Sequence, residues 1–110
     1  MRHLLVGLGL LLAVAGCQRP SQEACDKLCW RYAELQFWAA FEDQARDLAP
    51  EDRAILKAER TAEWEALRAS PENRGRDNCI RACRKGGKKA DLACVEAAET
   101  AVAARACMAE

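Results

Sequence analysis

The chain has 110 residues, with 17 basic and 17 acidic side chains, and therefore no net charge that would favour binding to nucleic acid. Its single histidine, His3, lies in an N-terminal segment that we expect to be removed. A mature chain without histidine excludes catalytic triads, histidine general bases and two-histidine zinc sites. We therefore expect a protein that is not an enzyme and has no catalytic residues.

Residues 1–16 have the composition of an export signal. Arg2 and His3 form a short positive patch, and an apolar stretch follows over residues 4–15. This stretch is too short for a membrane span, which needs about 20 apolar residues. We interpret residues 1–16 as a signal peptide that is cleaved from the mature protein.

The signal ends in Val14-Ala15-Gly16-Cys17, a motif that resembles the lipobox of bacterial lipoproteins. The resemblance implies that Cys17 carries a covalent lipid, which would be the only cofactor, and becomes the first residue after cleavage. Gln18 in place of an aspartate implies, by the same resemblance, an outer-membrane lipoprotein facing the periplasm. The alternative is an ordinary signal peptide that leaves Cys17 as an unpaired thiol. Residues 17–22 are expected to form a lipidated tether, and residues 23–110 a single domain.

The remainder of the chain is predicted to be all-α. It is rich in Ala, Glu, Arg and Leu and has no β-branched alternation. Pro50 suits the first turn of a helix and separates two long segments, which should pair as an antiparallel hairpin. We expect a small disulfide-stapled bundle of three to four helices built around this hairpin. The predicted helices cover residues 22 to about 48, 50–70, 77–85 and about 90 to the C-terminus, with residues 71–75 as a loop.

The first predicted helix carries large aromatic residues on more than one face. Leu28, Tyr32 and Leu35 share one side, whereas Trp30 and Phe37 lie on another. A helix that is apolar on two sides is either packed against two neighbours or exposes an apolar patch. The core is the simpler interpretation. The alternative is a docking surface for a partner helix or peptide, made of Trp30, Phe37, Trp38 and Phe41.

Six cysteines remain after Cys17, and an even number in a small exported chain is typical of a disulfide framework. Two C-x-x-x-C pairs place their cysteines on one face of a helix. Facing each other on antiparallel helices, they would form the disulfides Cys25–Cys83 and Cys29–Cys79.

Cys94 and Cys107 would be about 20 Å apart in one straight helix, too far for a disulfide. They can pair if the last segment folds back near Glu99, with Thr100 as a helix N-cap. The other connectivity joins Cys83 to Cys94 across the Gly86-Gly87 turn and leaves Cys79 and Cys107 for Cys25 and Cys29.

The twin C-x-x-x-C pattern resembles the stapled helical hairpins of small import chaperones of the mitochondrial intermembrane space and of some plant defence peptides. Only the four cysteines match, so the resemblance implies a hairpin and no function. The same thiolates could hold zinc or Cu(I), but an oxidising compartment favours disulfides, so no metal site is expected.

A basic run accompanies the third predicted helix and the turn after it. If Cys83 lies beside Cys25, this run comes close to the lipid anchor, where anionic headgroups would attract it. We expect a membrane-proximal basic patch made of Arg84, Lys85, Lys88 and Lys89.

These features together predict a lipid-anchored structural or protein-interaction module of the periplasm or envelope. Its expected partners are the membrane, through the lipid, and an unidentified envelope protein. The alternative is a holdase-like or inhibitory binding protein that captures apolar segments on the aromatic first helix. A thiolate metal carrier is the least favoured hypothesis.

Overall fold

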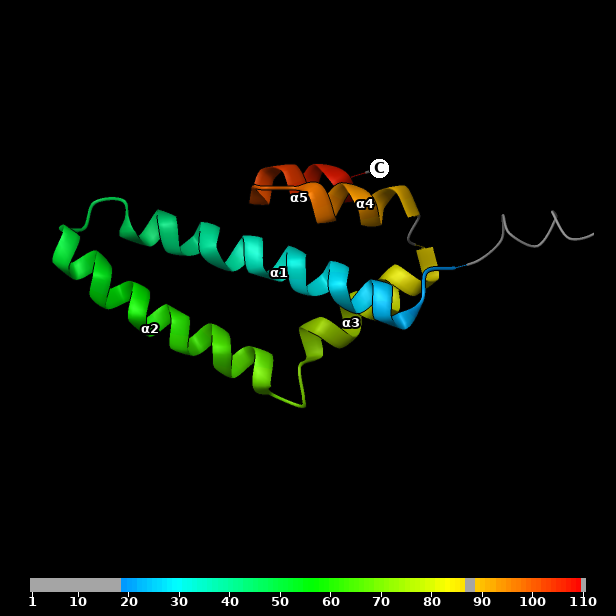
Figure 1. Cartoon of the computed structure of the whole chain (residues 1–110), viewed down its shortest axis with the longest axis horizontal. Coiled ribbons are helices and arrows are strands. Elements are labelled where there is room, and N and C mark those ends of the chain that lie inside the picture. Colours follow the sequence, from blue (N-terminus) through cyan, green and yellow to red (C-terminus); the bar gives the residue numbers. More distant parts are fainter. Residues whose placement is uncertain (1–18, 87–88, 110) are drawn as a thin grey trace, which may run out of the picture.

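The structure, a computed structural model, describes residues 19–86 and 89–109, and within them every regular element is an α-helix. Figure 1 shows α1 as the central element, with α2 on one side and the short helices α4 and α5 on the other. The all-α, disulfide-stapled fold predicted from the sequence is confirmed. The helices are α1 (Gln22–Ala45), α2 (Pro50–Ala69), α3 (Arg74–Gly86), α4 (Lys89–Ala97) and α5 (Ala101–Met108).

The α1–α2 hairpin begins and ends close to its predicted limits. The Ser21 hydroxyl caps α1 by accepting a hydrogen bond from the Ala24 amide at 3.1 Å. Helix α1 ends at Ala45, three residues before the expected end, because a turn precedes Pro50 and the Leu48 amide donates to the Ala45 carbonyl at 3.1 Å. Helix α2 starts at Pro50 as predicted.

Helix α3 starts earlier than the sequence predicted. The expected loop over residues 71–75 is wrong for its last two residues, because Asn73 acts as an N-cap. Its side-chain oxygen accepts a hydrogen bond from the Arg76 amide at 3.0 Å, so the helix begins at Arg74. An asparagine just ahead of a helix-forming run is a recognised start signal.

The last predicted segment folds back on itself. The Thr100 hydroxyl accepts a hydrogen bond from the Ala103 amide at 3.0 Å and starts α5, which confirms the predicted N-cap. Two α1 side chains hold this turn, since Arg31 donates to the Ala98 carbonyl at 2.7 Å and Gln36 to the Ala101 carbonyl at 3.3 Å. The central helix thereby satisfies the Ala98 carbonyl, just beyond the end of α4, and contacts the Ala101 carbonyl at the start of α5.

Three disulfides staple the fold. They have the favoured connectivity, so the alternative pairing of Cys83 with Cys94 is wrong. Two of them join α1 to α3 as successive rungs, and the third joins α4 to α5. The pairs are Cys25–Cys83, Cys29–Cys79 and Cys94–Cys107, with Cα–Cα distances of 5.7, 5.9 and 5.7 Å.

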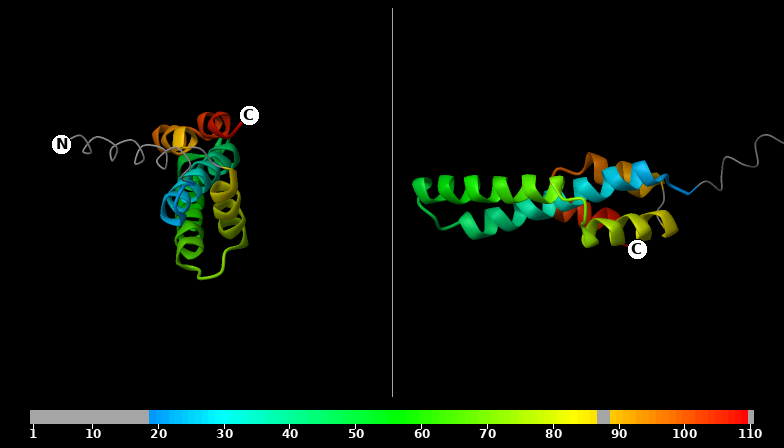
Figure 2. Two further views of the ribbon diagram at one scale, coloured as in Figure 1. Left: turned by 90° about the vertical axis from the view of Figure 1, so that its right-hand side faces the viewer. Right: turned by 90° about the horizontal axis from the view of Figure 1, so that it is seen from below.

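The core lies at the stapled end, where α1, α3 and α4 meet. The disulfide Cys25–Cys83, the outer of the two rungs, is buried there together with Leu28, Cys29 and Val95. By contrast, none of the 20 residues of α2 is buried. Both views of Figure 2 show α2 standing to one side of the other helices. Helix α2 is therefore less enclosed than its hairpin partner α1, which has five buried residues.

Candidate functional site

The two hairpin helices meet through a cluster of aromatic rings. The Trp64 ring of α2 lies edge-on to Trp30, with centroids 5.7 Å apart, and 5.3 Å from the Phe37 ring. Further along α1, Trp38 contacts Phe37 at 5.2 Å and Phe41 at 5.7 Å. The edge-to-face pair Trp30–Trp64 and the tilted pair Phe37–Trp64 cross between the helices, and aromatic pairs stabilise an interface beyond the apolar area that they bury.

The four aromatic residues expected to form a docking surface do not share one environment. Phe41 is only 2% exposed, so it belongs to the interior and is not available to a partner. The guanidinium of Arg53 covers its ring at 5.1 Å. Trp30, Phe37 and Trp38 are half-buried, and a partner can reach only parts of their rings.

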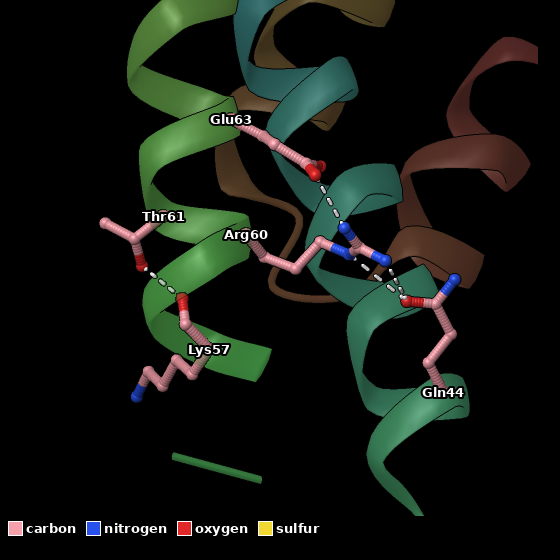
Figure 3. Close-up of polar contacts among 5 residues, drawn as sticks. All are labelled: Gln44, Lys57, Arg60, Thr61 and Glu63. Atoms are coloured by element: carbon pink, nitrogen blue, oxygen red, sulfur yellow. Dashed lines mark hydrogen bonds and ion pairs between the residues drawn. The ribbon is translucent and has the colours of Figure 1, made fainter. Parts of the chain in front are cut away.

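Polar side-chain contacts also join α2 to α1, closer to the turn at residues 46–49. Figure 3 shows Arg60 of α2 reaching across to Gln44 of α1, to which it donates hydrogen bonds of 3.1 and 3.2 Å, while also pairing with Glu63 at 2.7 Å. In the same figure, the Thr61 hydroxyl donates to the Lys57 carbonyl at 2.8 Å, which leaves it turned to its own helix. Exposed polar contacts of this kind contribute little stability, so the aromatic rings matter more.

An apolar cavity of about 610 Å³ opens beside the aromatic cluster, between α1, α2 and the start of α3. Its volume falls in the range of small-molecule and side-chain pockets. The inner of the two rungs, Cys29–Cys79, forms part of its floor. Only a few polar side chains line it. The residues that shape it are Trp30, Phe37, Trp64, Leu67, Arg76 and Cys79.

Arg76 lies between this cavity and the end of the molecule at which the described chain begins. Its Nε atom is buried and has no hydrogen-bond partner among the described residues. The nearest carboxylate oxygens, on Asp26 and Asp77, are each 3.8 Å away. The guanidinium carbon lies 5.9 Å from the centroid of the Trp30 ring, which Arg68 also covers at 4.7 Å. The aromatic cluster thus has a cationic rim.

A second, basic groove of about 430 Å³ lies on the other side of Arg76, between the residues that precede α1 and the outer surface of α3. Arg84 and Lys85 of the expected basic patch line it. Lys88 lies outside the described residues, and Lys89 is the first residue of α4. The groove also contains three cations that the predicted basic patch does not include: Arg19, Arg76 and Arg81. The spacing of three and four residues among Arg81, Arg84 and Lys85 was a usable signal.

The proposed lipid-bearing residue Cys17 and the signal over residues 1–16 lie outside the described residues. Among the described helices, none combines the length and apolar character needed to cross a bilayer. The described part of the chain also holds no group of three or more His, Cys, Asp or Glu side chains arranged to bind a metal ion.

Comparison of the chain with known protein families, with curated proteins and with solved structures returns no match.

Proposed function

We propose that this protein is a lipid-anchored, non-enzymatic module of the bacterial envelope that binds a partner protein through the α1–α2 hairpin. The observation that carries this proposal is the incomplete burial of α2 beside the apolar cavity. Ile55 is 60% exposed and Leu67 is 43% exposed, and Leu67 also lines the cavity. An apolar helix or peptide laid against this side would bury surface that the chain leaves open.

The anchor rests on the lipobox-like motif that ends at Cys17, and the disulfides agree with it. Three disulfides that engage all six remaining cysteines suit an oxidising compartment such as the periplasm. The chain enters the domain at the stapled end, and Figure 1 shows the α1–α2 turn at the opposite end. Helix α1 has 24 residues and is about 36 Å long, so the turn lies well away from the tether.

The first test is the intact mass of the protein extracted from membranes and alkylated without reduction. We expect a chain that starts at Cys17, carries acyl groups and takes up no alkylating agent, because the other cysteines are paired. A Cys17→Ser variant is the control and should lose the acyl mass. Retention of residues 1–16 without acyl groups would contradict the anchor, and alkylation of several cysteines would contradict the disulfide framework.

The second test addresses the cavity, with 1-anilinonaphthalene-8-sulfonate as a probe that has an aromatic body and one negative charge. We expect the dye to bind beside Trp64, with its sulfonate near Arg76. A Leu67→Glu variant should bind the dye at least about fivefold more weakly, because it replaces an apolar contact at the cavity wall with a negative charge that repels the sulfonate. Fluorescence titration measures the difference.

The matched control is Val102→Glu, which introduces the same charge at a residue of α5 that is 68% exposed and remote from the cavity. Circular dichroism checks that both variants keep the helical fold. Equal dye binding by the two variants, or no fluorescence increase with the native chain, would count against the hairpin as an apolar binding surface.

A further inference from the structure

Five cationic side chains surround the groove at the tethered end of the domain. Arg19 approaches it from the segment before α1, and the others come from α3. Figure 1 shows that the first described residues and the end of α3 lie at the same end of the molecule. The only acidic side chain lining the groove is Asp77. The cations are Arg19, Arg76, Arg81, Arg84 and Lys85.

Most of these cations have no counter-charge within the described chain. Arg81, Arg84 and Lys85 make no ion pair with any described residue, whereas Arg46, Arg53 and Arg60 on the hairpin each pair with a carboxylate. Described cations elsewhere, such as Arg68 and Arg105, also make no ion pair with a described residue, so what sets the groove apart is the gathering of five cations in one place.

The crowding of like charges opposes the stability of α3. Arg81, Arg84 and Lys85 fall within little more than one helical turn, a spacing at which like charges repel. The position of Arg84 and Lys85 in the last turn offsets part of this repulsion, because cations are favourable near a helix C-terminus. A bound anion would relieve the remainder. Arginine side chains suit phosphate oxygens in particular, since the guanidinium group offers paired N–H donors.

The position of the groove, close to the proposed lipid anchor, favours membrane phospholipids as the source of the phosphate. Cys17 precedes Arg19 by two residues, and two extended residues span at most about 7 Å. This reach is shorter than the distance of about 8 Å over which physiological salt screens charge. A lipid on Cys17 would thus hold the groove within the headgroup layer. Half-buried Ile80 adds an apolar contact to the groove wall.

We propose that this groove binds the phosphate groups of anionic phospholipids in the leaflet that holds the lipid anchor. The inference rests on the proposed anchoring at Cys17. The acyl groups keep the protein on the membrane, and the groove adds an electrostatic contact that holds α3 against the headgroups. Two such signals together restrict the orientation of the domain in a way that a flexible tether alone does not.

The experiment uses the native, membrane-extracted protein reconstituted into two kinds of vesicle, phosphatidylcholine alone and phosphatidylcholine with phosphatidylglycerol. An amine-reactive reagent labels exposed lysines, and peptide mass spectrometry compares Lys85 in the groove with Lys57 on α2. We expect phosphatidylglycerol to slow labelling of Lys85 at least about fivefold, as attraction of about one charge would produce. Labelling of Lys57 should not change, and high salt should remove the difference.

A variant and a matched control test whether the groove itself is responsible. Arg81→Gln with Arg84→Gln removes two groove charges and keeps both reporter lysines, and it should weaken the attraction about 25-fold and abolish protection of Lys85. Arg46→Gln with Arg105→Gln removes two charges from exposed sites elsewhere, and it should retain the protection.

The outcomes for the anchor and the groove can be separated. Flotation with phosphatidylcholine vesicles depends on the acyl groups alone, so failure to float there would overturn the anchor. A protein that floats but labels equally at Lys85 on both vesicles would overturn the groove and leave the anchor standing. Protection of Lys85 by soluble glycerol phosphate on phosphatidylcholine vesicles would also overturn the proposal, because the groove would then bind a free phosphate compound.

Discussion

Replacing all four cysteines that join α1 to α3 with alanine is expected to lower the free energy of unfolding by about 6.5 kcal/mol. The inner disulfide closes a loop with a sequence separation of 50, worth about 4 kcal/mol of chain entropy. The outer disulfide then closes only about eight further residues, which adds about 2.5 kcal/mol. A loss of this size approaches the whole stability of a domain of this length.

Because the two rungs are nested, removing one should cost much less than removing both. With Cys29–Cys79 intact, Cys25→Ala and Cys83→Ala together should cost about 2.5 kcal/mol, since the remaining rung still closes the long loop. Urea unfolding of the single-pair and four-cysteine variants measures these losses. The pair Cys94–Cys107, with a separation of 13, is the control. Its removal should cost about 3 kcal/mol whether or not the two disulfides between α1 and α3 are present. Finding that one rung alone accounts for the full loss would refute the nested arrangement.

Replacing Trp64 with alanine is expected to release α2 from α1 at a cost of about 2 to 3 kcal/mol. Full burial of a tryptophan would give a larger loss, but Trp64 is only half-buried. Its ring makes both of the aromatic contacts described between the two hairpin helices. The other contacts between the hairpin helices include exposed polar contacts, such as Arg60 with Gln44, which contribute little to stability.

The loss should be local, because no disulfide reaches α2 and the contacts near its ends, Arg53 with Phe41 and Arg68 with Trp30, are made by surface side chains. Amide hydrogen exchange should therefore rise along α2, while α1 and α3 next to the disulfides keep their protection. Ile55→Ala is the matched control on the same helix, where a residue that is 60% exposed should change stability by no more than about 0.5 kcal/mol. A uniform rise in exchange over all helices would show that α2 is part of one cooperative unit with the stapled core.

The sequence carries local signals that determine much of this fold. Pro50 starts α2, Ser21 and Thr100 cap α1 and α5, and each of these effects acts within one helical turn. Local spacing also favours the two disulfides between α1 and α3, since cysteines four residues apart share a helix face, but the sequence left a second connectivity open that only the folded structure excludes. The start of α3 at Asn73 was readable in the same way, as an N-cap signal that the turn-like composition of residues 71–75 obscured.

The candidate binding surfaces depend on more than local signals. The pattern of apolar residues on α1 is compatible with a core helix and with a docking helix, so the sequence could not distinguish the two. Burial of Phe41, together with the open side of α2 beside Leu67, is set by how α2 is placed against α1. The angle and distance between two helices arise from how their side chains interlock, which no short segment specifies.

The basic groove divides in the same way between sequence and tertiary structure. The sequence by itself determined that Arg84 and Lys85 lie in a basic helix end and that Cys25 can pair with Cys83. Only the tertiary structure brought Arg19 to this helix end and placed Arg76 between the groove and the aromatic cavity. The physical reason is separation along the chain, because Arg19 and α3 are joined only through the long hairpin and meet where the disulfides close it.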